Sequence, residues 1–154
     1  MKRPAGFAVR KTLYASLRFG LGTVLLVSSI FKADSPLAAS QLTSQFLAVP
    51  VAAANVIVYF LCLTEFTIAL FFWFDRCVRF ASVSSAALFM AAIAVGISTS
   101  GDPVDCGCFG DLMTSVTGTS FLVRSFVFLG TSMLTLYLAI ELTRGKGDDV
   151  HDYA

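Results

Sequence analysis

Two cysteines separated by a single glycine are the residues of this sequence best suited to chemistry. Cys106 and Cys108 flank Gly107, and Phe109 and Gly110 follow directly. Gly107 has no side chain, which removes a steric obstacle to closing so small a ring. A disulfide across one residue encloses too little chain to stabilise a fold appreciably, and strain makes such a bond easier to reduce. The spacing therefore favours thiol–disulfide exchange over a structural staple.

Other roles for this pair are also compatible with the sequence. Each sulfur can bridge to a partner protein, or both can stay reduced, and Phe109 is expected to anchor the segment on the rest of the chain. A metal site would need further ligands, and the nearby candidates are the carboxylates of Asp105 and Asp111. Two thiolates without histidine form an incomplete zinc shell, and His151 is the only histidine. We therefore expect no metal.

The composition indicates that these cysteines belong to a membrane protein. Of the 154 residues, 56% are hydrophobic and only 14% are charged, the formal net charge is +1 and the mean hydropathy is +0.80. Soluble domains usually carry about 25% charged residues, and nucleic-acid-binding domains carry basic patches. The chain is therefore not expected to be a soluble enzyme, a disordered chain or a nucleic-acid-binding protein.

Four apolar runs are long enough to cross a lipid bilayer as helices, which need about 20 residues each. The runs cover residues 14–31, 51–74, 80–97 and 121–142. The predicted fold class is all-α, an integral membrane four-helix bundle formed by residues 1–142. A polar tail, residues 143–154, follows it and is expected to lack regular structure. The first run has the basic start of a signal peptide, but its length and the charge of Arg18 favour a retained span.

The basic residues predict the orientation of the chain in the membrane. All of them except Lys32 and Arg124 lie in the first 18 residues, between the second and third runs, or after the fourth run. Because basic segments stay on the cytoplasmic side, both termini are predicted to be cytoplasmic. Residues 32–50 and 98–120 are then outside, where Cys106 and Cys108 meet a compartment in which disulfides persist.

Arg18 and Glu65 carry charges inside predicted spans. Lys32 and Val51 mark the predicted outer ends of those spans, and each charge lies 14 residues, about 21 Å, further inward. Since an isolated charge in the bilayer is costly, we predict an Arg18–Glu65 ion pair that clamps the bundle rather than conducting protons. Cys62 lies three residues before Glu65 and shares its helical face. It is expected to be a small buried side chain or an internal thiol.

These features resemble the MauE/DoxX-like family of small bacterial membrane proteins. The resemblance rests on Arg18, Lys32, Glu65 and the motif of residues 106–110 after the third span. The family often has Ser-Lys-Leu where this chain has Phe-Lys-Ala, so only the lysine carries over there. The resemblance implies a bacterial cytoplasmic membrane protein in extracytoplasmic redox biology. MauE is associated with maturation of methylamine dehydrogenase alongside a thioredoxin-like protein, and DoxX-like relatives with thiosulfate:quinone oxidoreduction.

The leading hypothesis is a membrane-bound thiol–disulfide oxidoreductase acting through Cys106 and Cys108. A thioredoxin-like partner outside the membrane would form a mixed disulfide with one sulfur, and the other sulfur would resolve it. The sequence contains no second close cysteine pair, so onward electron transfer would need a quinone or another protein. The alternative is a non-enzymatic structural or assembly subunit of a larger membrane complex. A transporter that uses Arg18 and Glu65 is a third interpretation.

Overall fold

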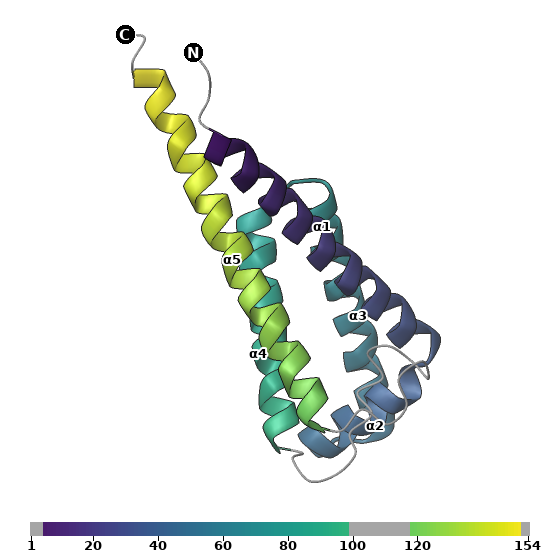
Figure 1. Ribbon diagram of the computed structural model, residues 1–154. Coiled ribbons are helices and arrows are strands. Elements are labelled where there is room, and N and C mark those ends of the chain that lie inside the picture. Colours follow the sequence, from purple (N-terminus) through teal and green to yellow (C-terminus); the bar gives the residue numbers. More distant parts are fainter. Residues whose placement is uncertain (1–4, 99–117, 152–154) are drawn as a thin grey trace.

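The part of the chain that the structure describes is built from helices. The computed structural model describes residues 5–98 and 118–151, with side chains for 9–98 and 122–143. The helices follow in the order α1 (Ala5–Asp34), α2 (Pro36–Leu47), α3 (Val51–Trp73), α4 (Val78–Ser98) and α5 (Gly118–His151) (Figure 1). The start of α1 and the end of α5 lie at one end of the bundle, and α2 lies at the other.

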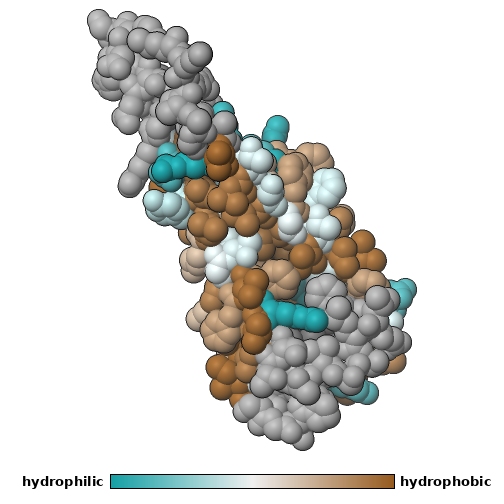
Figure 2. All heavy atoms as spheres, in the orientation of Figure 1, coloured by the Kyte–Doolittle hydropathy of each residue, from teal (hydrophilic) through white to brown (hydrophobic). Residues whose placement is uncertain are grey.

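Four of these helices are long and apolar enough to cross a membrane. The candidate spans are Val9–Asp34, Val51–Trp73, Val78–Ser98 and Leu122–Thr143. Large apolar side chains are exposed on their outer surfaces, among them Phe60, Phe80 and Tyr137, and apolar residues gather along much of the face shown in Figure 2. A water-soluble protein would bury such a surface, whereas lipid accepts it. The protein is thus an all-α, multi-pass membrane protein, which confirms the predicted fold class.

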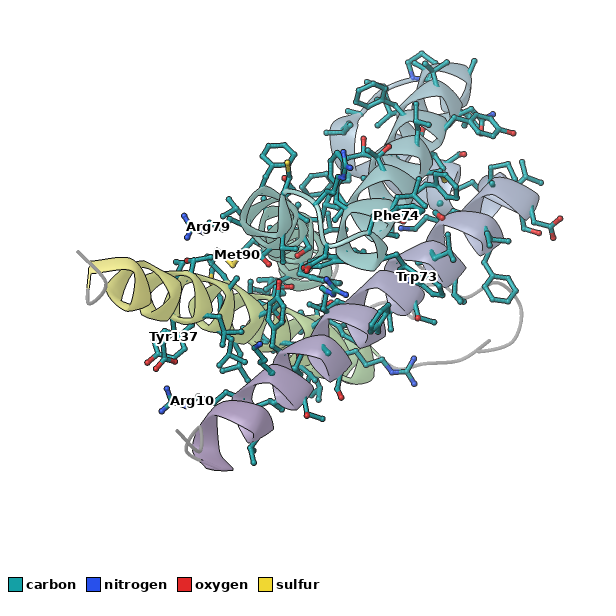
Figure 3. All side chains as sticks on the ribbon, turned by 90° about the horizontal axis from the view of Figure 1, so that it is seen from above. Arg10, Trp73, Phe74, Arg79, Met90 and Tyr137 are labelled. Atoms are coloured by element: carbon teal, nitrogen blue, oxygen red, sulfur yellow. The ribbon has the colours of Figure 1, made fainter. Side chains whose placement is uncertain are left out.

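The fifth helix is longer than its candidate span. It continues to His151, so the prediction that the polar tail lacks regular structure was wrong up to that residue. Adding residues to a helix that has already formed in the membrane costs little free energy, because the unfavourable nucleation step has already occurred. Side chains from two neighbouring helices support α5 at this end: Arg10 of α1 pairs with Glu141, and Arg79 of α4 donates to the Thr143 hydroxyl. Figure 3 shows these two arginines on opposite sides of α5.

A short helix that the sequence analysis did not predict separates α1 from α3. Pro36 begins α2, where its missing N–H costs nothing, although a proline inside α1 would have broken that helix. After α2, Ala48 adopts the left-handed conformation (φ 51°, ψ 40°), and its N–H donates to the Ser44 carbonyl. The Ser40 hydroxyl donates to the side-chain oxygen of Asn55 and fastens α2 to α3. The first part of α3 is therefore covered by α2.

Helices α1 and α3 pack against each other in opposite directions. Leu21 and Leu25 of α1 share a buried cluster with Phe72 of α3. The contact is close at Gly22, where an added Cβ would lie 2.7 Å from Trp73 Cδ1 and 3.2 Å from Phe72 Cβ. Figure 3 shows Trp73 beside α1. The absence of a side chain at Gly22 is what lets these two helices approach so closely.

Helices α4 and α5 form a second antiparallel pair with small side chains between them. The fully buried polar positions of this pair are Ser82, Ser85, Ser132 and Thr135. The Ser85 hydroxyl donates to that of Ser132 at 3.0 Å, and small residues of this kind allow close helix packing in lipid. Val78, Ala81 and Ala139 join the buried cluster of α1 and α3. The two helix pairs therefore share one core.

Replacing Gly22 with alanine is expected to lower the free energy of unfolding by about 1 to 2 kcal/mol, because the new methyl group overpacks the α1–α3 contact. Gly20 is the matched control, since a Cβ at that position meets nothing within 4 Å. Alanine at Gly20 should be neutral or stabilising, as it is at open helical positions. Thermal unfolding of both variants in detergent micelles measures the difference. Equal stability of the two variants would contradict the close contact at Gly22.

Candidate functional site

A buried ion pair joins the last turn of α1 to the middle of α3. Lys32 Nζ lies 2.5 Å from Glu65 Oε1, and the Ser28 hydroxyl donates to Glu65 Oε2 at 3.3 Å. The exposed fractions of Lys32 and Glu65 are only 5% and 6%. Each carboxylate oxygen therefore has a donor, and the two opposite charges offset the cost of removing each other from water.

Arg18 does not reach this pair. Its guanidinium pairs with the carboxylate of Asp75, in the turn that follows α3, and the Tyr14 hydroxyl donates to the same carboxylate at 3.2 Å. The predicted Arg18–Glu65 ion pair is therefore wrong. These contacts tie α1 to the turn between α3 and α4, and Lys32 is the partner of Glu65.

The error has a geometric cause. The prediction placed Lys32 and Val51 at the same depth, as the two ends of neighbouring spans. Because α2 lies between α1 and α3 and covers the first part of α3, the end of α1 lies beside the middle of α3 instead. Glu65 lies about 21 Å along α3 from Val51 and about 12 Å from Trp73. The contacts that Lys32, Gly22 and Arg18 make with α3 and the turn after it are thus displaced toward the C-terminal end of α3.

The surroundings of Arg18 are aromatic as well as charged. The guanidinium carbon lies 4.8 Å from the ring centroid of Phe19 and 5.8 Å from that of Tyr14, distances at which a cation is attracted to a ring face. Arg18 itself is 9% exposed, and its Nε atom has no hydrogen-bond acceptor among the described residues. Asp75, by contrast, is largely exposed, with a side-chain exposure of 59%. The two members of this ion pair therefore differ in burial: Arg18 is buried, whereas Asp75 is largely exposed.

Cys62 is a buried free thiol beside the Lys32–Glu65 pair. Its exposed fraction is 7%, and it packs with Ala39 of α2 and Val58 of α3. Glu65 follows Cys62 by three residues and so lies one helical turn further along the same face of α3. The burial of Cys62 and Glu65 agrees with the prediction that they share an inward face. The Cys62 thiol is thus covered by Ala39 of α2 and lies one helical turn before the Glu65 carboxylate.

The predicted reactive pair and its neighbours lie outside the described residues. This applies to Cys106, Gly107, Cys108, Phe109 and Gly110. The helices that flank their segment are described: α4 ends at Ser98 and α5 begins at Gly118, both at the end of the bundle that carries α2 (Figure 1). The segment is therefore attached at the end opposite the start of α1 and the end of α5.

The remaining free thiol of the described residues is Cys77, which is exposed in the turn between α3 and α4. Both Cys77 and Asp75 have positive φ angles, 52° and 56°, which makes this turn sharp. Within the described residues, no group of three or more histidine, cysteine, aspartate or glutamate side chains is arranged to hold a metal ion.

Sequence reasoning missed two partners in these clusters. Asp75 was overlooked because an acid in a short connection between spans is ordinarily solvated. The sequence did contain a signal for Asp75, because it is the only acidic residue in the connection that also holds Arg76 and Arg79. Ser28 was overlooked because serine is common in spans, although it lies one helical turn before Lys32 and so shares its face.

The comparisons with known proteins identify a family. Neither the curated proteins nor the solved structures gave a match. The model of the family described as "Methylamine utilisation protein MauE" matches residues 10–138. That range contains the Lys32–Glu65 and Arg18–Asp75 ion pairs, the buried thiol, the Cys106–Gly107–Cys108 motif and all four candidate spans except the first residue of the first and the end of the last. Because the match covers far more than half of its 154 residues, the chain belongs to the MauE family.

Proposed function

We propose that this MauE-family protein is a thiol–disulfide oxidoreductase of the bacterial cytoplasmic membrane. Cys106 and Cys108 are its reactive pair, and its partner is a thioredoxin-like protein outside the cytoplasm. The residue types support the reaction, because a pair separated by one glycine favours a readily reduced disulfide. The family supports the setting, because its description refers to methylamine utilisation and the matched range includes the motif.

The distribution of charge between the two ends of the bundle is the observation that supports the proposal. Arg10 and Lys11 of α1, Arg76 of the turn after α3 and Arg79 at the start of α4 belong to the end where α1 begins and α5 ends (Figure 1). Basic segments favour the cytoplasmic side. The opposite end, where α4 ends and α5 begins, then faces outward, and it is there that residues 99–117 are attached. This arrangement supports an extracytoplasmic location for the cysteine pair.

The proposed exchange is balanced without a further cofactor. The thiolate of one cysteine attacks a partner disulfide, forming a mixed disulfide and releasing one partner thiolate, which takes up a proton. The second cysteine then gives up its proton and attacks the mixed disulfide. The pair ends as a disulfide, and the partner has gained two electrons and two protons. In the opposite direction, the partner dithiol becomes the disulfide and Cys106 and Cys108 become thiols.

Trapping of mixed disulfides tests this reaction. Cys108→Ala retains one attacking thiol and should accumulate a covalent complex with a thioredoxin-like protein whose second cysteine is replaced by serine and whose first cysteine is supplied as a mixed disulfide with a small thiol, which leaves as Cys106 attacks. The double variant Cys106→Ala, Cys108→Ala should form no such complex. Cys62→Ser and Cys77→Ser are the matched controls and should trap normally. Complexes are counted on non-reducing gels and located by mass spectrometry. Undiminished trapping by the double variant would end the proposal.

Labelling of intact spheroplasts tests the orientation separately. A membrane-impermeant maleimide, added after mild reduction, should modify Cys106 and Cys108, whereas the exposed thiol of Cys77 should react only after lysis. Labelling of Cys77 before lysis would reverse the orientation. A pair that stays unreactive after reduction, in a protein that co-purifies with stable partner subunits, would favour the structural or assembly role instead.

A further inference from the structure

Positive charge exceeds negative charge where α1 meets the turn between α3 and α4. Tyr14 and Arg18 of α1 both contact the Asp75 carboxylate, and the exposed Arg76 is the next residue of the turn. Lys11 is also exposed and lies two helical turns before Arg18, on the same face of α1. We call these five residues the turn cluster. Its cations outnumber its anions, which leaves the cluster with a net positive charge.

The turn cluster also lacks a hydrogen-bond acceptor for one of its donors. Arg18 is only 9% exposed, and its Nε atom has no acceptor among the described residues. The Asp75 carboxylate is a partial counter-charge, because it is 59% exposed and also accepts from the Tyr14 hydroxyl. A buried donor without a partner is costly, and the planar guanidinium fork matches the geometry of a phosphate. The missing acceptor therefore points to an oxyanion supplied from outside the chain.

Aromatic rings lie directly beside the turn cluster. Trp73 and Phe19 pack edge to face with their centroids 5.8 Å apart, and the Arg18 guanidinium carbon lies 4.8 Å from the Phe19 centroid. Trp73 and Phe19 are 47% and 42% exposed, and the neighbouring Phe74 is 70% exposed. Such rings gather where the head groups of a bilayer meet its acyl chains. A positive cluster bordered by exposed rings suits a lipid better than it suits a free ion.

We propose that the turn cluster binds the head group of an anionic phospholipid. The phosphate oxygens accept hydrogen bonds from Arg18 and Arg76, the charge of Lys11 adds attraction, and the acyl chains lie along the Phe19 and Trp73 rings. A zwitterionic lipid is held less strongly, because the same cations repel its ammonium group. Access needs no cavity, because Arg76 and both rings are exposed where lipid surrounds the protein. The site is independent of the proposed thiol–disulfide exchange.

The fluorescence of Trp73 tests the proposal, because this residue is the only tryptophan of the chain. The full-length protein is reconstituted into phosphatidylcholine bilayers that contain increasing fractions of brominated phosphatidylglycerol. A second series with brominated phosphatidylcholine is the zwitterionic comparison. Bromine quenches tryptophan on contact, so the two quenching curves give the preference for the anionic lipid. Because each cation near a membrane surface contributes about a fivefold effect, we expect a preference of at least about tenfold.

Replacement of single cations tests which residues produce this preference. Arg76→Gln and Arg18→Met should each lower it by about fivefold. Arg79→Gln is the matched control, because it removes the same charge from the same end of the bundle, although that arginine contacts Thr143 of α5 instead. This control should change the preference by less than about twofold. Circular dichroism verifies that each variant is folded.

Three results would overturn the proposal. The first is equal quenching of the parent protein by the two brominated lipids. The second is a preference that stays unchanged in folded Arg76→Gln and Arg18→Met, or that falls equally in Arg79→Gln, which would indicate the general field of that end rather than a site. The third is relief of quenching by excess inorganic phosphate but not by chloride at the same ionic strength, which would assign the cluster to a free anion. Quenching that phosphate leaves unchanged supports the lipid.

Discussion

Lys32→Met is expected to lower the free energy of unfolding by about 3 to 5 kcal/mol, because it leaves the Glu65 carboxylate buried without its counter-charge. Glu65 is 6% exposed, so water cannot replace the lost ammonium group. The Ser28 hydroxyl would remain as a neutral donor, which is a weak substitute for a cation. Chemical unfolding in mixed lipid–detergent micelles, followed by circular dichroism, measures the loss.

The double variant Lys32→Met, Glu65→Met is the informative companion to this experiment. Replacing both members of a buried ion pair with apolar side chains is often neutral or stabilising, so most of the lost stability should return. A double variant as unstable as the single one would mean that the shape of the two side chains, rather than their charge balance, determines the stability of this contact.

The second ion pair should respond asymmetrically to loss of its two members. Asp75→Ala leaves the guanidinium of Arg18 unpaired at 9% exposure and should cost about 2 to 3 kcal/mol. Arg18→Met leaves Asp75 unpaired, but that side chain is 59% exposed, so water can solvate it. The cost of Arg18→Met should therefore stay within about 1 kcal/mol.

The same unfolding assay in micelles compares the two variants. Tyr14→Phe removes the other hydrogen bond to Asp75 and is the matched control for loss of a single contact, expected at about 1 kcal/mol. Equal losses for Asp75→Ala and Arg18→Met would show that the two charges are equally buried in the membrane, in conflict with the exposed position of the turn.

The sequence was sufficient to predict the membrane class and the shared helical face of Cys62 and Glu65. Arg18, Leu25, Ser29 and Lys32 recur at helical spacing, and all of them are buried. The inward position of Cys62 and Glu65 followed from the same periodicity. These predictions depend only on the regular geometry of one helix, which the spacing of residues determines directly.

The ion-pair partners on neighbouring helices could not be predicted, because they depend on how far one helix is shifted along its neighbour. The shift of α1 along α3 is set by α2, whose apolar and small residues show no strong helical periodicity in the sequence. Pro36 was the available signal, since a proline can begin a helix but interrupts one already running. The depth calculation that paired Arg18 with Glu65 failed at this point, although both residues do form ion pairs with other partners.

The pairing of Lys32 with Glu65 also constrains how the protein is made. The two residues are 33 positions apart, so during synthesis Lys32 enters the translocon before Glu65 has been added to the nascent chain or has reached the lipid. A lysine at the centre of an inserting helix costs about 2.5 to 3.5 kcal/mol, and Lys32, in the last turn of α1, costs less because its long side chain can reach the interface. The apolar residues of the first helix must bear that cost alone until the third helix arrives. During biogenesis, the first helix is therefore least stable in the membrane in the interval before α3 is inserted. That interval ends when the Lys32 ammonium group pairs with the Glu65 carboxylate.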